Sequence, residues 1–391
     1  MEIMELKISR RVSGIQPSAT LAIVALARDL KAKGRPVLSF SAGEPDFASP
    51  DGAIIAARNA MDRGETHYTA NSGIPELKRI ISAYYKTRFD IDYDPSEIIV
   101  SGGAKQTIYQ ALQTLADKDQ EILILNPSWV SYVEQVRLAD AKDVMIDTSA
   151  SGFAPTREDM ERALSDKTVG MIINTPNNPT GVVYDRETLE MLAGIARQND
   201  LWIIFDEVYE RFVYGEAKHY NILQLAPDLR DRVIIVNGVS KAYSMTGWRI
   251  GYALGPKKVV SKMDDIQSHL NSNPSSISQW ASVGAIKDSE SYIESNRHEF
   301  KRRRDLLMDL LSGVGGLKIE RPDGAFYAFL DVRNTSVPDD NEFCRRILEE
   351  KFVALVPGDA FFAPGYVRMS YACSEADIRE GAERIIEFLR G

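Results

Sequence analysis

Residues 98–115 read IIVSGGAKQTIYQALQTL: a short apolar run, a pair of glycines and a stretch with helical periodicity. The β-branched run is typical of a buried strand, and the periodicity predicts a helix over 104–115, directly after the glycines. Continuous apolar strands are covered on both faces, so runs of this kind predict an α/β fold whose mostly parallel sheet is flanked by helices. Longer helical patterns, such as 187–198, separate the further apolar runs, which lie at 122–125, 171–173, 202–205 and 233–236.

The two ends of the chain follow another pattern. Residues 18–33 have the periodicity of an amphipathic helix, and 290–312 that of a long, highly charged one. We expect a large α/β domain over 51–290 and a smaller α+β domain built from 1–50 and 291–391. The basic run KRRRD at 301–305 is expected to be a solvated face of the charged helix. The remaining C-terminal patterns predict strands at 325–332 and 366–372 and helices at about 340–350 and 375–389.

Composition excludes several classes of protein. The 391 residues are 44% hydrophobic and 26% charged, which is ordinary for a globular protein and excludes a disordered, collagen-like or disulfide-rich chain. The 47 Lys and Arg residues against 56 Asp and Glu residues give a net charge of −9, which disfavours nucleic-acid and membrane-surface partners. Two cysteines without a C-x-x-C pair, no signal-peptide pattern and no apolar run of about 20 residues predict a cytoplasmic protein without a membrane helix.

Several catalytic motifs are absent from the sequence. There is no phosphate-binding G-x-x-x-x-G-K-[ST] loop, no G-x-S-x-G and no H-E-x-x-H. A nicotinamide-dependent dehydrogenase, which alternating strands and helices alone would allow, lacks its G-x-G-x-x-G fingerprint. The four histidines lie far apart along the chain, so we expect no metal site.

Chemically informative residues follow the predicted strands. The glycines at 102–103 can aim backbone N–H groups and a helix N-terminus at an anion, although a turn that merely ends the strand is the more ordinary explanation. Asp206 follows the run at 202–205, so its carboxylate either emerges into the crevice at the sheet edge or caps a helix. Ser240 and Lys241 follow the run at 233–236 in the same way.

Lys241 and Arg249 complete the pattern. Apolar neighbours such as Tyr243, Met245 and Trp248 suggest a partly buried amine, and burial lowers the pKa of a lysine and frees its lone pair for Schiff-base chemistry. Arg249 borders an apolar run and needs an anionic partner, either an internal carboxylate or a ligand phosphate. Together these residues ask for a ligand with a phosphate, a carbonyl group and a basic ring nitrogen. Pyridoxal 5′-phosphate (PLP) has all three.

The sequence resembles the class I (fold type I) PLP-dependent aminotransferases, and within them the prokaryotic aspartate aminotransferase subgroup. The resemblance extends nearly from end to end and implies a fold type I transferase. The motifs that carry it are SRRVSGIQPSAT (9–20), AGEPDF (42–47), HYTANSGIPELK (67–78), SGGAKQ (101–106), NPSWVSY (126–132), NTPNNPTG (174–181), DEVY (206–209), SKAYSMTGWRIGY (240–252), DGAFY (323–327) and VRMSYA (367–372).

The resemblance implies cofactor-binding roles for these residues. Lys241 would hold PLP as a Schiff base and later move a proton between the substrate Cα and the cofactor. Asp206 would pair with the pyridine N–H⁺ and so make the ring an electron sink. The other residues implied to hold PLP are Tyr209 and Asn178 at the 3′ oxygen, Trp129 stacked on the ring, and Gly103, Ala104, Ser240 and Arg249 at the phosphate, with Lys105 as a further candidate there.

The resemblance also implies how substrate and a second subunit bind. Arg368 would grip the substrate α-carboxylate bidentately, beside Gly43, Trp129 and Asn178. Tyr68 would reach the phosphate in the neighbouring subunit, which implies a homodimer with active sites at its interface.

Two features depart from the family pattern. Many relatives have S-x-S-K before the lysine, whereas this chain has Gly238 at the first serine position, so one phosphate bond is missing. Some dicarboxylate-specific relatives carry basic residues near the positions of Gln16 and Gln113. Neutral residues there weaken a preference for aspartate and glutamate, unless a cation elsewhere in the pocket replaces them.

The sequence therefore predicts a ping-pong aminotransferase that takes its amine most readily from aspartate and passes it to 2-oxoglutarate. Transamination of aromatic amino acids, alanine or prephenate, and β-elimination, stay open because they use the same cofactor site. A regulatory protein built on this fold would need a DNA-binding region, and the segment before residue 37 has no helix-turn-helix pattern and no basic surplus.

Overall fold

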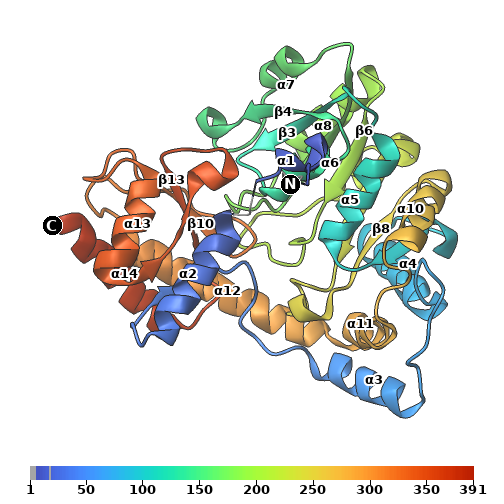
Figure 1. Ribbon diagram of the computed structural model, residues 1–391, viewed down its shortest axis with the longest axis horizontal. Coiled ribbons are helices and arrows are strands. Elements are labelled where there is room, and N and C mark those ends of the chain that lie inside the picture. Colours follow the sequence, from blue (N-terminus) through green and yellow to red (C-terminus); the bar gives the residue numbers. More distant parts are fainter. Residues whose placement is uncertain (1–5, 17–18) are drawn as a thin grey trace, which may run out of the picture.

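The computed structural model describes residues 6–16 and 19–391, and Figure 1 shows how its helices and strands are arranged. In the described residues a seven-stranded sheet has the order β2-β8-β7-β6-β5-β3-β4, and only the two pairs that include β8 are antiparallel. The prediction of a mostly parallel sheet is confirmed. Its strands are β2 (Ile98–Ser101), β3 (Glu121–Asn126), β4 (Lys142–Asp147), β5 (Thr168–Asn174), β6 (Trp202–Asp206), β7 (Val233–Gly238) and β8 (Gly251–Leu254).

Both faces of this sheet are buried, which explains the continuous apolar runs. Successive side chains of a strand point to opposite faces: Ile99 packs in one core with Ile108 and Met263, whereas Ile98 packs in another with Leu77. Helices α5, α6 and α10 cover the first face, and α4, α8 and α11 cover the second. Every predicted apolar run lies in a strand of the sheet. Edge strand β4 has no such run because most of its side chains are partly or fully exposed.

The helices agree with the periodic patterns of the sequence. The predicted helix at 104–115 has the same bounds in the structure, and the charged pattern at 290–312 is one long helix. None of the described helices is both long and apolar enough to cross a membrane. The helices are α1 (Arg10–Ser13), α2 (Ala19–Ala32), α3 (Asp51–Asp62), α4 (Pro75–Phe89), α5 (Ala104–Leu115), α6 (Ser131–Leu138), α7 (Arg157–Ala163), α8 (Arg186–Gln198), α9 (Ile222–Leu225), α10 (Lys257–Leu270), α11 (Ser276–Asp288), α12 (Glu290–Leu311), α13 (Asp340–Lys351) and α14 (Glu375–Arg390).

The C-terminal part of the chain builds a second, smaller layer of structure beside the first (Figure 1). Its four-stranded antiparallel sheet has the order β12-β13-β10-β9 and shares a core with α12, α13 and α14. The N-terminal segment joins this part because Leu38 pairs with Val353 in a two-stranded parallel sheet. The strands are β1 (Leu38–Ser39), β9 (Lys318–Ile319), β10 (Tyr327–Asp331), β11 (Val353–Ala354), β12 (Val356–Pro357) and β13 (Tyr366–Ser370).

The basic run on α12 differs from expectation. Arg303 and Arg304 are buried, so a fully solvated face is wrong at these two positions. Helix α12 runs from α11 into the C-terminal layer (Figure 1), where one of its faces packs in the core around Phe300. The buried guanidiniums are satisfied there: Arg303 pairs with Asp46 at 2.7 Å, and Arg304 pairs with Asp305 at 2.7 Å.

Strand register brings the chemically informative residues together. In neighbouring parallel strands Asn174 is the pairing partner of Asp206, and Asp206 is the partner of Val236. The carboxyl ends of β5, β6 and β7 therefore lie at one edge of the sheet, where α/β proteins bind their ligands. The chain continues from β7 into the segment with Lys241, so the predicted site residues converge at this edge.

Candidate active site

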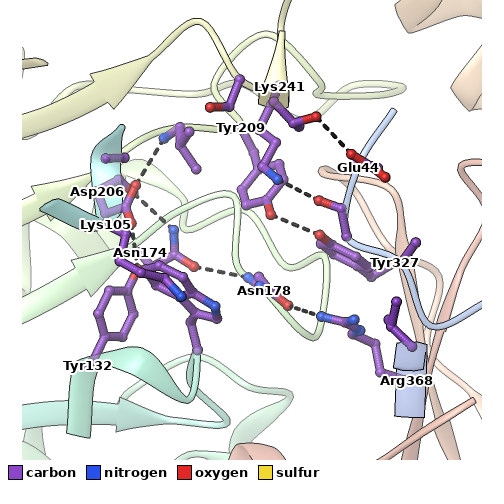
Figure 2. A pocket seen from close by; sticks show the side chains of 18 of the residues that line it. Glu44, Lys105, Tyr132, Asn174, Asn178, Asp206, Tyr209, Lys241, Tyr327 and Arg368 are labelled. Atoms are coloured by element: carbon purple, nitrogen blue, oxygen red, sulfur yellow. Dashed lines mark hydrogen bonds between the residues drawn. The ribbon is translucent and has the colours of Figure 1, made fainter. Parts of the chain in front are cut away.

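A cavity of about 400 Å³ opens at this edge, between the large sheet and the C-terminal layer. All predicted site residues except Gly103 and Tyr68 line it. Figure 2 shows Asp206 and Tyr132 on one side and Arg368 and Tyr327 on the other, with Asn178 between them. The predicted residues that line the cavity are Gly43, Ala104, Lys105, Trp129, Asn178, Asp206, Tyr209, Ser240, Lys241, Arg249 and Arg368.

Lys241 presents its amine to this cavity. Nζ donates a hydrogen bond to Gly43 O at 2.5 Å and lies 5.7 Å from the centre of the Tyr209 ring. Burial lowers the pKa of Lys241 to about 8, although the nearby Glu44 carboxylate acts in the opposite direction. A larger fraction of neutral amine is therefore present near neutral pH than for a solvated lysine, which is the property that Schiff-base chemistry needs.

Asp206 is a buried carboxylate that forms no ion pair with any described side chain, although Lys241 is near enough to lower its pKa. Its oxygens accept hydrogen bonds from Tyr132 OH at 2.6 Å and from Val208 N–H at 3.1 Å. Burial raises the pKa of Asp206 to about 6, while both hydrogen bonds oppose that rise. A cationic N–H group placed in the cavity would stabilise the ionised carboxylate and offset the cost of burying it.

A chain of hydrogen bonds crosses the floor of the cavity from Asp206 to Arg368 (Figure 2). The Asn174 side chain donates to Asp206 O at 3.1 Å, and its Oδ1 accepts the Asn178 N–H at 3.0 Å. Asn178 Oδ1 in turn accepts from Arg368 at 3.0 Å. Because each member holds the next, the backbone of Asp206 and the guanidinium of Arg368 are linked through Asn174 and Asn178.

Tyr209 faces Tyr327 across the cavity. The two hydroxyl oxygens are 2.9 Å apart, and burial raises the pKa of both tyrosines. Both side chains therefore carry their protons at neutral pH, and a hydroxyl of this pair is available to donate to a ligand oxygen.

An anion site lies at the N-terminus of α5. Gly103 caps the helix with φ +101°, and the first N–H groups of the helix have no intrahelical acceptors. Arg249 lies against Gly103 and donates to Gly102 O at 3.2 Å and to Thr246 O at 3.0 Å. Lys105 lies 5.0 Å from the centre of the Trp129 ring, and burial lowers its pKa, with the positive charge of Arg249 adding to the effect. Two cations and a helix N-terminus at one place favour a phosphate.

Arg368 is the clearest unsatisfied charge in the described part of the chain. It is buried on β13 between the rings of Tyr327 and Phe361, at 4.5 and 4.8 Å. Its NH2 group donates to Ser41 O at 2.8 Å, but Nε has no partner and no described carboxylate forms an ion pair with it. Burial lowers the pKa of Arg368 because no described carboxylate nearby offsets the loss of solvation. A carboxylate of a ligand would supply the missing partner.

Some predicted residues lie elsewhere. Gly103 is next to the lining, where a side chain would collide with Arg249. Tyr68 is 90% exposed and does not reach the cavity of its own chain. Gln16 and Gln113 do not line the cavity either, so the lack of charge at these two positions does not alter the charge of the lining.

The cavity also contains residues to which the sequence alone assigned no role. Glu44 accepts a hydrogen bond from Thr246 at 2.7 Å at the mouth, and Tyr132, Asn174 and Tyr327 make the contacts described above. All four lie inside motifs that carried the family resemblance. A signal was therefore present, but only the spatial arrangement shows what each side chain touches.

Comparisons with known proteins agree with this geometry. Residues 35–385 match the family model for aminotransferase class I and II. The chain is 42% identical to the aspartate aminotransferase of Geobacillus stearothermophilus, over 98% of this chain and 99% of that one. It is 40% identical to the aspartate/prephenate aminotransferase of Thermus thermophilus, over 98% of each chain.

Solved structures give the same result. The Thermus thermophilus aspartate aminotransferase with maleate has a TM-score of 0.94 at 40% identity, covering 98% of this chain and all of that one. The Rhizobium meliloti aspartate aminotransferase also has a TM-score of 0.94, at 39% identity, with 98% of each chain covered. The chain therefore belongs to the class I and II aminotransferases and is a PLP-dependent enzyme of that family.

Proposed function

We propose that the enzyme transfers the amino group of aspartate to 2-oxoglutarate in two ping-pong half-reactions. Relatives from Geobacillus stearothermophilus and Bacillus subtilis, at 42% and 41% identity over nearly full length, carry the name aspartate aminotransferase. The observation that carries the proposal is that one cavity holds both a buried amine of lowered pKa, Lys241, and a buried arginine, Arg368, without an ion-pair partner among the described residues.

The residues at the cavity fit PLP. Arg249, Ser240 and the N-terminus of α5 match a phosphate, and the Asp206 carboxylate matches a protonated ring nitrogen. Trp129 has an aromatic face for the ring, and Lys241 has the amine that binds an aldehyde. When bound, PLP supplies an electron sink for the carbanion that forms when an amino acid loses its α-proton.

The chain's own residues supply binding and proton transfer. Arg368 would orient the substrate through its α-carboxylate, because its fixed guanidinium can donate two parallel bonds. The amine of Lys241, with a pKa of about 8, is suited both to take a proton from Cα and to return it. Asn178 joins Arg368 to the Asn174–Asp206 pair, so substrate and cofactor would be held in one register.

A dicarboxylate needs one more cation. Lys105 lines the same cavity and has no described carboxylate partner, so it is available to the phosphate or to the second carboxylate of aspartate. This supports aspartate as donor even though Gln16 and Gln113 are neutral.

Visible absorption of the purified protein tests the proposal. We expect a yellow band with bound PLP that shifts when aspartate is added and returns on addition of 2-oxoglutarate. A protein that PLP cannot turn yellow would refute the cofactor assignment. A band that shifts with other amino acids and stays unchanged with aspartate would refute the donor.

A second candidate is amino transfer to prephenate, because the relative from Thermus thermophilus is named aspartate/prephenate aminotransferase. Steady-state rates with aspartate, aromatic amino acids, alanine and prephenate would rank the substrates. Release of pyruvate and ammonia would reveal β-elimination instead.

We also propose a homodimer in which Tyr68 reaches the phosphate site of the partner subunit. The high exposure of Tyr68, Ile55 and Met61, apolar or aromatic side chains of one segment, supports a covered surface there. We further propose a large domain over 51–290 and a small one from 1–50 and 291–391, supported by the two cores on the faces of the large sheet and by a mostly C-terminal core, which residues 208–214 also join. A cytoplasmic location is supported by two free thiols, Cys344 and Cys373.

A further inference from the structure

Two adjacent buried carboxylates lie where β6 ends, Asp206 as its last residue and Glu207 directly after it, and only one of them faces the cavity. Asp206 lines the cavity, whereas Glu207 does not and is fully buried. The Glu207 N–H still donates to Val236 O at 3.1 Å, so the pairing with β7 continues through this residue. Successive side chains of a strand point to opposite faces, which directs Glu207 away from the cavity. Nothing in the proposed reaction uses it.

Side chains from outside β6 hold the Glu207 carboxylate. Tyr85 of α4 donates to Oε1 at 2.7 Å, and Asn221 donates to Oε2 at 3.0 Å. Nε2 of His219 lies 2.8 Å from the same Oε2, and the His219 side chain is almost completely buried. Tyr85, Glu207, His219, Asn221 and Asn237 are called the Glu207 cluster below.

The Glu207 cluster also reaches the strand that precedes Lys241. Asn237 of β7 donates to Tyr85 OH at 3.4 Å, and its Oδ1 accepts the Gly238 N–H at 2.7 Å. From Gly238 the chain continues directly to Lys241. The cluster therefore connects α4 to both segments that carry the reactive groups.

Packing around the cluster leaves its members little freedom. The His219 ring lies 6.0 Å from the Phe89 ring and 6.1 Å from the Phe205 ring, and Asn221 caps α9 by accepting the Leu223 N–H at 3.0 Å. A buried carboxylate is costly unless donors surround it, and an apolar side chain would fill this space without that cost. A fully bonded carboxylate at this place therefore points to a positioning role.

We propose that Glu207 is a positioning residue for Asp206. The Glu207 cluster fixes the backbone at the end of β6, and this fixes the direction in which the Asp206 carboxylate enters the cavity. The side chain of Asp206 has two other hydrogen bonds. Tyr132 OH donates from the cavity lining, and Val208 N–H donates from the loop that follows β6. The inference rests on the proposed function in one respect: Asp206 is taken to pair with the ring nitrogen of PLP.

The variant Glu207→Gln tests this inference in the full-length holoenzyme. The amide has nearly the volume of the carboxylate, but its NH2 group cannot accept a hydrogen bond from the donors that face it. The Glu207 cluster therefore loses one hydrogen bond and the negative charge of the carboxylate. We expect PLP to dissociate about tenfold more readily, since a bond to a charged group is lost behind the residue that holds the ring. The visible circular dichroism of bound PLP, which reports ring orientation, should also change.

Asp340→Asn is the matched control. Asp340 is a buried carboxylate of α13 that accepts the Asp359 N–H at 2.8 Å and the Gly365 N–H at 2.9 Å, and no residue next to it in the chain lines the cavity. Its loss should lower resistance to urea as much as Glu207→Gln does and leave the PLP readouts unchanged. If both variants lose stability and both keep wild-type PLP affinity and dichroism, the positioning role is refuted.

A double-mutant cycle with Asp206→Asn separates positioning from a general loss of structure. If Glu207 acts through Asp206, the double variant should bind PLP no more weakly than Asp206→Asn alone. Additive losses would overturn the inference. Should Glu207→Gln fail to fold, Tyr85→Phe removes one donor with little change in volume and is measured in the same way. A wild-type protein that binds no PLP would refute the proposed function before any variant is compared.

Discussion

Arg368 places a positive charge in the protein interior without an ion-pair partner in the described part of the chain, and the free-energy cost of that burial indicates a ligand-binding role. A buried ion without a counter-charge destabilises the folded state, so the position is explained only by a partner that arrives with the substrate. Burial also disfavours the charged form of Lys241, to a smaller degree, and so lowers its pKa. The residues with the least favourable surroundings in the free protein are thus those assigned to chemistry.

The variant Arg368→Gln should separate stability from substrate binding. We expect the PLP-free protein to resist urea at least as well as wild type, because an unpaired buried charge is removed. The KM of every amino acid should rise by about a hundredfold, since a bidentate charged contact is lost. Arg346→Gln, at an exposed pair with Glu350, is the control and should change neither. A rise confined to aspartate would make Arg368 a side-chain selector instead.

Lys241 predicts a pH dependence of folding. Its pKa falls from 10.5 to about 8 on folding, so between these pH values the unfolded chain binds more protons than the folded one. Stability of the PLP-free protein should therefore rise with pH across this window, by about 3 kcal/mol in total, and the penalty is complete below it. Urea unfolding of wild type and Lys241→Met at steps through the window measures the difference. An equal slope in both proteins would contradict the lowered pKa.

The sequence is informative about single residues where one property is decisive. Asp206 could be predicted because it directly follows an apolar run, and Lys241 because apolar residues surround it in the sequence, whereas the role of Arg368 is implied by the family resemblance alone. Tyr132 and Glu44 could not be assigned roles, because their functions depend on partners distant in the chain, such as Asp206 and Thr246. Local pattern identifies a buried charge, whereas its hydrogen-bond partner is a property of the folded chain.

At the scale of elements, the N-terminus of α5 depends on one glycine. Gly103 has φ +101°, and a Cβ there would lie 2.3 Å from NH2 of Arg249. Gly103→Ala should therefore strain the backbone and displace the guanidinium, weakening PLP binding by about tenfold or more. Titration of the yellow band with PLP measures this. Gly194→Ala in α8, where a Cβ meets no atom within 4 Å, should leave binding unchanged. Equal effects of both substitutions would argue against a phosphate site at this helix.

Elements were predictable to the extent that their burial is periodic. Five strands of the central sheet, β2, β3, β5, β6 and β7, could be predicted because both their faces are apolar, whereas edge strand β4 could not because its pattern is mixed. Helix α12 was predicted with nearly the correct bounds, but its buried Arg303 and Arg304 were not. Charge alone suggests solvent, while the carboxylates that neutralise these arginines come partly from the distant loop with Asp46.

At the scale of the whole molecule, the chain has a net charge of −9 but contains one site where basic side chains gather. Lys105, Lys241, Arg249 and Arg368 all line one cavity, to which the large sheet and the C-terminal layer both contribute. An acidic exterior with a positive cleft attracts small anions to the cleft and disfavours extended polyanions. This arrangement matches a phosphate cofactor and carboxylate substrates.

The proposed dimer predicts that active sites are shared between subunits. Light scattering should give twice the chain mass of 43.6 kDa. Lys241→Ala should be inactive, and Tyr68→Ala should have low activity at limiting PLP. Coexpressed, the two variants should form hybrid dimers with one intact site and give about a quarter of wild-type activity. Lys241→Ala with Arg368→Gln should regain none, because both residues line the cavity of one chain. If neither coexpressed pair recovers activity and light scattering gives the mass of a single chain, each chain works alone and Tyr68 has no part in the site.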